Sequence, residues 1–245
     1  MTSPPEAGAG SQAPRAGVET TLKICAVIPA FNEADVIAGV VAAVKPQVAE
    51  VVVVDDGSSD GTGDRAAEAG AVVLRLDSNQ GKGAALRRAL ADIAPRGFTH
   101  VLFMDGDGQH RADDIPLLIE QAATTGADLV IGVRSFDRAL MPRSRHFSNT
   151  VGSWIASRLV GRTIADSQTG FRLIRLEPLL RLRLRARRYE IEMEVLLKLC
   201  AQGGTLAHVP VGMVYHSGRA RSKMHPIRDT IRICLWSLAF RYLNK

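Results

Sequence analysis

The sequence predicts an α/β fold in which helices cover both faces of a mostly parallel central sheet. Apolar runs of strand length alternate with helically spaced segments from residue 22 to residue 133, which is typical of parallel strands joined by crossover helices. Residues 51–54 are four consecutive valines, as expected for a strand buried on both faces. A chain of 245 residues with 46% hydrophobic residues can form one globular domain with a sizeable core.

The first half of the chain supplies the elements of this sheet in regular order. Its strands are short apolar runs, and its helices carry apolar side chains on one stripe. We expect strands at residues 22–30, 51–54, 71–76, 99–104 and 129–133, and helices at residues 33–45, from Ser58 or Ser59 as N-cap to about residue 69, at 83–93 and at 113–124.

The second half is less regular and strongly basic. Residues 1–133 carry 10 Lys and Arg against 18 Asp and Glu, a net charge of −8, whereas residues 134–245 carry 21 against 7, a net charge of +14. An acidic half suits a metal site, and a basic half suits phosphate, an anionic lipid or nucleic acid, or is only a solvated cationic surface. We expect helices at residues 148–159, 190–201 and 226–242, a short strand at 171–174, and one or two strands within 206–215.

Composition divides the chain into three parts. Residues 1–20 are rich in Ala, Gly, Pro and Ser and lack the apolar stretch of a signal peptide, so we expect a disordered tail. The main domain is expected over residues 21–217, followed by a basic loop and an amphipathic helix over 218–245. No apolar run approaches the roughly 20 residues of a membrane-spanning helix. Three widely spaced cysteines predict buried thiols in a reducing cytoplasm.

Polar or glycine-rich segments follow the expected strands. Pro29-Ala30-Phe31-Asn32-Glu33 follows the first strand, Asp55-Asp56 the second, Asn79-Gln80-Gly81-Lys82-Gly83 the third, Asp105-Gly106-Asp107-Gly108-Gln109-His110 the fourth, and Arg134 the fifth. The carboxyl ends of parallel strands meet at one edge of the sheet, where ligands bind. The sequence therefore predicts a functional site at this edge.

The segment after the fourth strand has the chemistry of a metal site. Asp105 and Asp107 are two residues apart, so their carboxylates point the same way in an extended chain and repel each other, and a divalent cation relieves that repulsion. Gln109 adds a neutral oxygen, and His110 offers a nitrogen. Such oxygen ligands suit Mg²⁺ or Mn²⁺, which often share their coordination shell with substrate phosphates. The alternative is a turn in which Asp and Gly serve geometry alone, and the position beside four other polar strand ends favours the metal.

The segment Gly81-Lys82-Gly83 has two interpretations. It can place backbone amides and an ammonium group near a phosphate at the start of a helix, or it can form a tight strand-to-helix turn. The sequence contains no Walker-type glycine-rich loop. The Asp55-Asp56 pair must face the strand end, where one carboxylate can bind a base or ribose and the other can cap the loop.

Several motifs together resemble the family 2 glycosyltransferases of GT-A fold, and more narrowly the polyprenol-phosphate sugar transferases such as dolichol-phosphate mannose synthase. Three motifs in the first half carry the resemblance: Ile28-Pro29-Ala30-Phe31-Asn32-Glu33, residues 54–62 and residues 105–110. Three in the second half carry its narrower form: residues 166–172, which end in Thr-Gly-Phe-Arg, residues 189–194 and Arg221-Ser222-Lys223. The resemblance covers about residues 22–230.

This resemblance implies an inverting, metal-dependent transfer of a hexose from a nucleoside-diphosphate sugar of the GDP-mannose or UDP-glucose type to a polyprenyl phosphate. It implies that Asp107, Arg134 and Lys223 are catalytic and that Asp105, Asp107 and Gln109 hold Mg²⁺ or Mn²⁺. The residues implied to bind the nucleotide sugar are Pro29, Phe31, Glu33, Val54, Asp56, Asp105, Gly106, Arg219 and Arg221.

The acceptor side departs from the family pattern. The family usually has an Arg six residues before the Lys, with a Gly between them, but Ser217 and Ala220 stand at these positions here. Either Arg219 or Arg221 is expected to replace the missing arginine.

Two kinds of acceptor remain open at this point. A lipid phosphate is already an anionic nucleophile, whereas a hydroxyl on a small molecule or polysaccharide needs a general base, for which Asp166, Glu192 and Glu194 are the candidates. A lipid acceptor favours peripheral contact with the inner face of the membrane, for which residues 181–188 and the last helix are candidates. The alternatives are a solvated edge or loop for residues 181–188, and docking against the core or a second subunit for the helix. A non-catalytic binding protein is disfavoured by the intact Asp105, Asp107 and Gln109, and nucleic acid by the 5% aromatic content.

Overall fold

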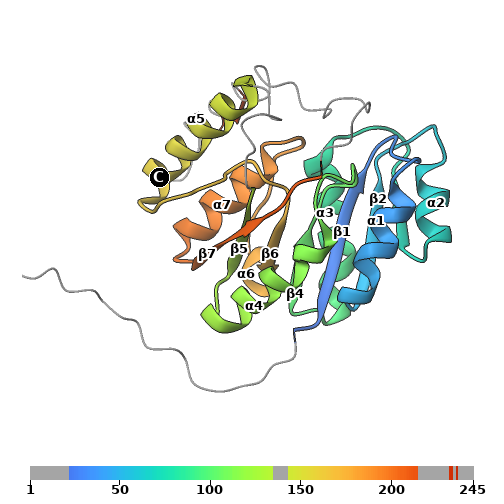
Figure 1. Ribbon diagram of the computed structural model, residues 1–245, viewed down its shortest axis with the longest axis horizontal. Coiled ribbons are helices and arrows are strands. Elements are labelled where there is room, and N and C mark those ends of the chain that lie inside the picture. Colours follow the sequence, from blue (N-terminus) through green and yellow to red (C-terminus); the bar gives the residue numbers. More distant parts are fainter. Residues whose placement is uncertain (1–21, 135–142, 215–231, 234–235, 237–245) are drawn as a thin grey trace, which may run out of the picture.

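The computed structural model describes residues 22–134, 143–214, 232–233 and 236, and it has the predicted α/β architecture (Figure 1). Its seven-stranded sheet has the order β3-β2-β1-β4-β6-β5-β7. All strand pairs are parallel except those that β6 makes with β4 and β5. The strands are β1 (Ile24–Ala30), β2 (Glu50–Asp55), β3 (Val72–Arg75), β4 (His100–Phe103), β5 (Leu129–Arg134), β6 (Arg172–Arg175) and β7 (Leu206–Val211).

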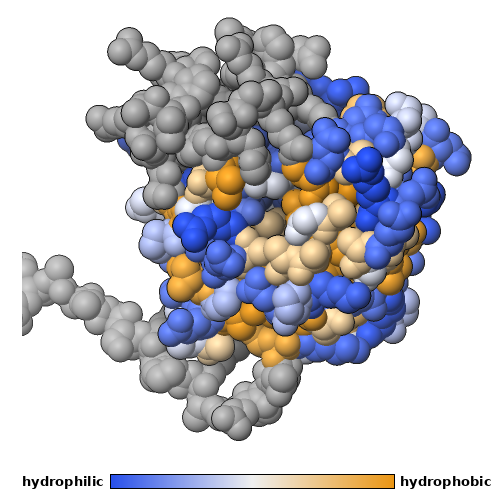
Figure 2. Space-filling model, turned by 45° about the vertical axis from the view of Figure 1, so that its right-hand side comes forward, coloured by the Kyte–Doolittle hydropathy of each residue, from blue (hydrophilic) through white to orange (hydrophobic). Residues whose placement is uncertain are grey.

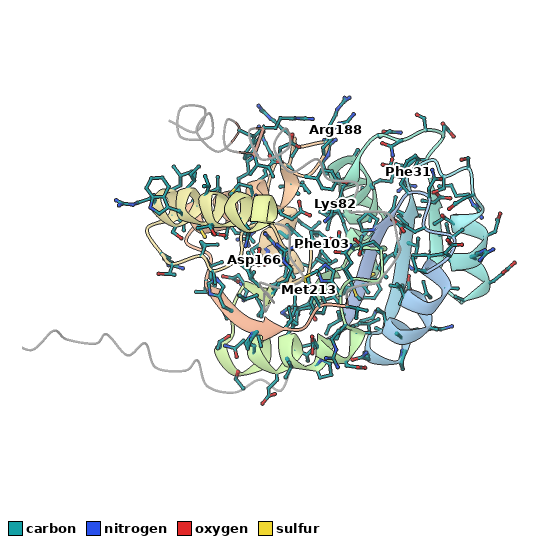
Figure 3. The ribbon with its side chains drawn as sticks, turned by 45° about the horizontal axis from the view of Figure 1, so that its top comes forward. Phe31, Lys82, Phe103, Asp166, Arg188 and Met213 are labelled. Carbon is teal, nitrogen blue, oxygen red and sulfur yellow. The ribbon has the colours of Figure 1, made fainter. Side chains whose placement is uncertain are left out.

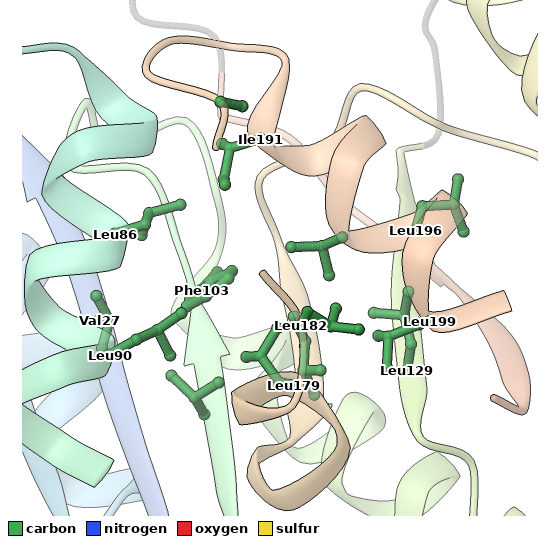
Figure 4. Packing of buried hydrophobic residues seen from close by; sticks show 14 of the residues in the cluster. Val27, Leu86, Leu90, Phe103, Leu129, Leu179, Leu182, Ile191, Leu196 and Leu199 are labelled. Atoms are coloured by element: carbon green, nitrogen blue, oxygen red, sulfur yellow. The ribbon is translucent and has the colours of Figure 1, made fainter. Parts of the chain in front are cut away.

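Helices cover both faces of the sheet. Helices α1, α2 and α4 pack against one face, and α3, α6 and α7 pack against the other. Figure 4 shows the second of these cores, where side chains of α3, α6 and α7 meet Phe103 and Leu129 of the sheet. The helices are α1 (Ile37–Val44), α2 (Thr62–Glu68), α3 (Lys82–Ile93), α4 (Ile115–Thr125), α5 (Arg143–Val160), α6 (Leu176–Leu180) and α7 (Ile191–Ala201), with single 3₁₀ turns at Lys45–Gln47, Ala94–Arg96 and Ala112–Asp114.

Two predicted helix starts were too early. Helix α1 begins at Ile37 instead of residue 33, because the Glu33 carbonyl accepts hydrogen bonds from the amides of Val36 and Ile37 in a turn that precedes the helix. Helix α2 begins at Thr62, and neither Ser58 nor Ser59 caps it. Gly61 is the N-cap, and the preceding Asp60 accepts hydrogen bonds at its Oδ1 from the Thr62 amide and hydroxyl.

Strand β6 has an orientation that the sequence did not indicate. It was predicted as a short strand, and the structure inserts it antiparallel between β4 and β5. The amino end of β6 therefore lies at the same edge as the carboxyl ends of the six parallel strands. This places residues 166–171, which precede β6, beside the segment that follows β4.

The surface away from this edge is mixed. Figure 2 shows hydrophilic and hydrophobic residues interspersed over the coloured surface of one face.

Cys25 is buried as predicted, Cys200 is half-buried against the core, and Cys234 lies outside the described residues. Within the described part of the chain, no helix is both long and apolar enough to cross a bilayer.

Candidate active site

The loops that follow β1 and β2 are joined by hydrogen bonds. The Asn32 amide donates to the Ser58 hydroxyl at 2.9 Å, and the Asn32 side-chain oxygen accepts from the Ser59 amide at 3.0 Å. Asp60 accepts from the Ala34 amide at 3.0 Å. These reciprocal contacts hold the two loops as one unit beside the strand ends.

Four residues predicted to line the nucleotide belong to this unit or to the strands below it. Pro29, Phe31 and Glu33 are half-buried, and Val54 is fully buried. Phe31 lies at the site edge, on the far side of Lys82 from Asp166 (Figure 3). The structure thus places these residues together, and their contact with a nucleotide stays a prediction.

Asp56 is engaged by the protein itself. Its two carboxylate oxygens accept hydrogen bonds from the amides of Gln80, at 2.7 Å, and Gly81, at 2.8 Å. Burial raises the pKa of Asp56, and these two amides offset part of that rise. Asp56 therefore anchors the start of α3 to the end of β2, and its binding of base or ribose stays a prediction.

Asp105 and Asp107 lie close together directly after β4. The Gln109 amide donates to Asp107 Oδ1 at 3.0 Å and shapes the loop. Burial and the neighbouring carboxylate of Asp105 both raise the pKa of Asp107. Burial acts in the same direction on Asp105, but the charge of Lys82 and a contact from His110 outweigh it and hold the pKa of Asp105 well below its usual range. The Nε2 atom of His110 lies 3.4 Å from Asp105 Oδ2.

Lys82 is the cation that compensates these acids. Its ammonium group forms ion pairs with Asp105 and with Glu192 of α7. Burial disfavours the charged amine, yet the two carboxylates outweigh that cost and raise the pKa of Lys82. The residue therefore stays protonated between Asp105 and Glu192.

Two glycines let the backbone approach closely around Lys82. A Cβ atom at Gly170 would come within 2.5 Å of Asp105 Oδ2 and 2.7 Å of Lys82 Nζ. Gly81 has a φ angle of +94°, and a Cβ atom there would come within 2.6 Å of the Arg187 carbonyl oxygen. The segment around Lys82 is therefore a tight turn that also brings an ammonium group to Asp105, and its contact with a phosphate stays a prediction. Its first amide binds Asp56, which leaves the ammonium group as the part directed at Asp105.

Arg134 is fixed at the end of β5 by a buried carboxylate. Its Nε and Nη2 atoms donate to the two oxygens of Asp166 at 2.7 and 3.0 Å, and Asp166 is fully buried. Such a bidentate pair orients the guanidinium plane. The predicted contact of Arg134 with phosphate stays a prediction, now with a defined positioning partner.

Arg172 ties the segment before β6 to α7. It is only 1% exposed, and its guanidinium donates to the backbone carbonyls of Thr169, Ser167 and Glu192 at 2.9, 2.7 and 2.6 Å. Burial lowers the pKa of this arginine. Three carbonyl acceptors match the several N–H donors that one guanidinium group offers.

The structure thus assembles the predicted residues of the first half and leaves part of the second half outside the described residues. Arg219, Arg221 and Lys223 lie there, as do the tail over 1–20 and most of the predicted part over 218–245. Sequence reasoning gave Lys82 one of two interpretations, an ammonium group near a phosphate, and assigned no role to Arg172. The Thr-Gly-Phe-Arg motif was the signal for Arg172, and the lysine between two glycines was the signal for Lys82.

The residues present fit a divalent cation that a substrate helps to hold. Within the described residues, no group of three His, Cys, Asp or Glu side chains is arranged to hold a metal by itself. Asp105, Asp107 and Gln109 offer oxygen ligands on one short loop, where burial and the charge of Asp105 raise the pKa of Asp107 and a cation would offset both effects. Mg²⁺ and Mn²⁺ are bound in this way, by one or two carboxylates together with substrate phosphates.

Comparison with known proteins identifies the family. A family model described as glycosyl transferase family 2 matches residues 25–182. The chain belongs to this family. It is 33% identical over 211 residues to the glycosyltransferase AglJ of Haloferax volcanii, covering 84% of this chain and 68% of that protein. It is 29% identical over 236 residues to the undecaprenyl-phosphate mannosyltransferase of Micrococcus luteus, covering 90% and 96% of the two chains.

Solved structures support the same fold for this glycosyltransferase. Mannosyl-3-phosphoglycerate synthase from Rubrobacter xylanophilus superposes with a TM-score of 0.74 at 20% identity, over 92% of this chain and 75% of that one. Glucosyl-3-phosphoglycerate synthase from Mycobacterium tuberculosis, in complex with Mn²⁺ and UDP-glucose, gives a TM-score of 0.72 at 24% identity, over 90% and 80%. The predicted GT-A fold is thereby confirmed.

Proposed function

We propose that this glycosyltransferase moves a hexose from a nucleoside-diphosphate sugar to a polyprenyl phosphate, with inversion at the sugar carbon and with Mg²⁺ or Mn²⁺. The undecaprenyl-phosphate mannosyltransferase of Micrococcus luteus supports the acceptor by its name, as does the polyprenol monophosphomannose synthase of Mycolicibacterium smegmatis, which is 30% identical over 226 residues. The Mn²⁺ and UDP-glucose complex of the structural neighbour supports the donor class and the metal.

The observation that favours a phosphate acceptor is that the candidate general bases are already bound by other groups of the protein. Asp166 is bound by Arg134, and Glu192 by Lys82. Glu194 is fully buried. Its carboxylate accepts hydrogen bonds from the amides of Arg185 and Ala186 and forms an ion pair with Lys198 at 2.6 Å. A general base must be free to accept a proton from the acceptor. Each of these carboxylates instead already has a cation or backbone amides as partners.

An acceptor phosphate removes the need for a base. Its oxygen is already anionic and forms the new bond to the sugar carbon, while the bond from that carbon to the donor phosphate breaks and its electron pair leaves with the nucleoside diphosphate. No proton has to move in this step. A hydroxyl acceptor would have to lose a proton to one of the paired carboxylates.

Charge around the leaving diphosphate is then the main requirement. When bound, a divalent cation offsets the negative charge that develops on the leaving phosphates. Asp105, Asp107 and Gln109 would hold that cation. Lys82, held between Asp105 and Glu192, would present its ammonium group to the same phosphates, and Arg134 would present a guanidinium oriented by Asp166.

The test compares a polyprenyl phosphate with the matching polyprenol, which differs only by the phosphate group. Labelled GDP-mannose, UDP-glucose and related donors are supplied with each acceptor in detergent, with Mn²⁺, with Mg²⁺ or with a chelator. We expect label in the organic phase only with the phosphate and only with a divalent cation. Equal transfer to polyprenol, or transfer only to water-soluble acceptors, would overturn the lipid-phosphate assignment.

A further inference from the structure

Residues 181–188, the arginine segment, lie beside the site, and their exposed side chains form a cationic stripe. The side chains of the segment alternate between exposed arginines and apolar residues that face the core: Leu182 and Ala186 are buried and Leu184 is half-buried. Leu182 packs with Leu179 in the core of Figure 4. The exposed residues are Arg181, Arg183, Arg185, Arg187 and Arg188.

Buried polar groups hold the backbone of the arginine segment in place. Glu194, which is fully buried, accepts hydrogen bonds from the amides of Arg185 and Ala186 at 2.9 and 2.7 Å. Lys198 pairs with Glu194 and donates to the Arg183 carbonyl at 2.5 Å. The arginines are therefore presented from a fixed backbone, and a buried carboxylate is used to fix it.

The same segment contacts the loop that carries Lys82. The Ala84 amide donates to the Arg187 carbonyl at 3.1 Å, and a Cβ atom at Gly83 would come within 2.5 Å of the Ala186 carbonyl oxygen. Figure 3 shows Arg188 and Lys82 at the same end of the molecule. The stripe thus adjoins the site edge.

Four of the five exposed arginines of the stripe have no ion-pair partner among the described residues. Arg181 pairs with Glu177. No acidic side chain among the described residues forms an ion pair with Arg183, Arg185, Arg187 or Arg188. A fixed row of unpaired guanidinium groups is complementary to a surface of closely spaced phosphates.

We propose that the arginine segment binds the anionic surface of a phospholipid bilayer and holds the site edge against it. Two features favour a bilayer over a nucleic acid. Residues 181–188 contain no aromatic side chain on which a base could stack, and Leu180, at the start of the stripe, is 41% exposed and available to the apolar side of an interface. The inference rests on the proposed function in one respect: a lipid acceptor gives the site edge a reason to face the membrane.

The experiment measures binding of the full chain to vesicles that contain no acceptor, by co-sedimentation at increasing ionic strength. The vesicles are phosphatidylcholine alone or phosphatidylcholine with an equal amount of phosphatidylglycerol. The variant combines Arg183→Gln, Arg185→Gln and Arg187→Gln. A matched control removes three exposed cations elsewhere, with Lys23→Gln, Lys45→Gln and Arg75→Gln.

We expect the unmodified chain to bind the anionic vesicles and to be released by salt. Each arginine near such a surface contributes a factor of about five in affinity, so the arginine variant should bind on the order of a hundredfold more weakly. The control variant should bind within a few-fold of the unmodified chain. Unchanged vesicle binding by a correctly folded arginine variant would overturn the proposal. Binding of single-stranded RNA in preference to anionic vesicles would also overturn it.

Failure of this inference can be separated from failure of the proposed function. Transfer to polyprenyl phosphate in detergent does not require a bilayer, so the arginine variant should keep it. If both chains transfer sugar in detergent and bind vesicles equally, the function stands and the stripe has no role. If vesicle binding depends on the stripe but no sugar reaches the polyprenyl phosphate, the membrane-binding role of the stripe is confirmed and the acceptor assignment is wrong.

Discussion

Residues 22–134 place their functional groups directly at strand ends, whereas residues 143–214 place theirs along a chain of buried ionic contacts. In the first half, Asp105 and Asp107 follow β4 and Arg134 ends β5. In the second half, Asp166 and Arg172 are almost fully buried. Asp166 binds Arg134 of the first half, and Arg172 donates hydrogen bonds to backbone carbonyls.

The two halves meet in one connected network. Asp166 holds Arg134, Arg172 holds the carbonyl of Glu192, and the Glu192 carboxylate holds Lys82, which pairs with Asp105. The first half thus supplies the groups that would face the donor, and the second half fixes their positions and charge states. Substitutions in the first half should therefore mainly lower the rate of sugar transfer, and substitutions in the second half should mainly lower stability.

The largest effect is expected for Asp107→Asn, which removes a charge of the first half without changing shape. Loss of one electrostatic contact to a developing charge typically costs up to about a thousandfold in kcat. We expect a loss of that order in transfer, together with weaker Mn²⁺ binding measured by electron paramagnetic resonance. Asp113→Asn, an exposed acid shortly after the same loop, is the control and should leave both unchanged. Near-normal turnover by Asp107→Asn would remove Asp107 from the metal site.

Arg172→Met tests whether the second half acts mainly through stability. Three carbonyls would lose their donor in a buried site, and removing one partner of such a buried charged network typically costs about 3–5 kcal/mol. We expect the free energy of unfolding in urea to fall by that amount. Arg175→Met, the partly exposed arginine at the end of the same strand, should cost about 1 kcal/mol or less. Equal losses for the two variants would show that Arg172 is not a structural hub.

A double-mutant cycle on Lys82→Met and Glu192→Gln measures the link between the halves. Lys82→Met should lower kcat/KM about a hundredfold, because the site loses its only buried ammonium among the described residues. Glu192→Gln should cost less, since Asp105 still pairs with Lys82. Contacting charges usually show a coupling energy of about 0.5–3 kcal/mol. Additive effects would mean that Glu192 does not position Lys82.

The smallest effect is expected at the opposite edge, where His100 of β4 faces Arg175 of β6. Burial, and then the charge of Arg175, lowers the pKa of His100 from 6.5 to about 4. Because the unfolded chain binds a proton that the folded chain rejects, stability should fall as the pH drops from about 6.5 to about 4, by at most about 3 kcal/mol. The free energy of unfolding in urea, plotted against pH over this range, should have a shallower slope for His100→Asn than for the unmodified protein. The half-buried His208 is the comparison, and His208→Asn should change the slope less. An unchanged slope in His100→Asn would mean that His100 titrates normally in the folded protein.

The sequence by itself determined the fold class and the position of the first-half site. Runs such as residues 51–54 can only be buried strands, and crossover connections bring their carboxyl ends to one edge. The acids and glycines after β4 were therefore predictable as a cluster, because local order along the chain decides which residues follow each strand. Glu33 and the serines before α2 were placed wrongly as helix starts, because their hydrogen bonds go to the neighbouring loop, which no local pattern reveals.

Only the tertiary structure decided what the second half does. The antiparallel insertion of β6 between β4 and β5 brings Gly170 against Asp105 and Lys82. Contacts between residues more than a hundred positions apart, such as Lys82 with Glu192, depend on which helices share a face of the sheet. The same residue types occur as solvated charges in any basic surface. The burial of these charged side chains and the identity of their partners, which no local pattern reveals, make Arg172 a hub, Glu192 a counter-ion and the neighbouring arginines an exposed stripe.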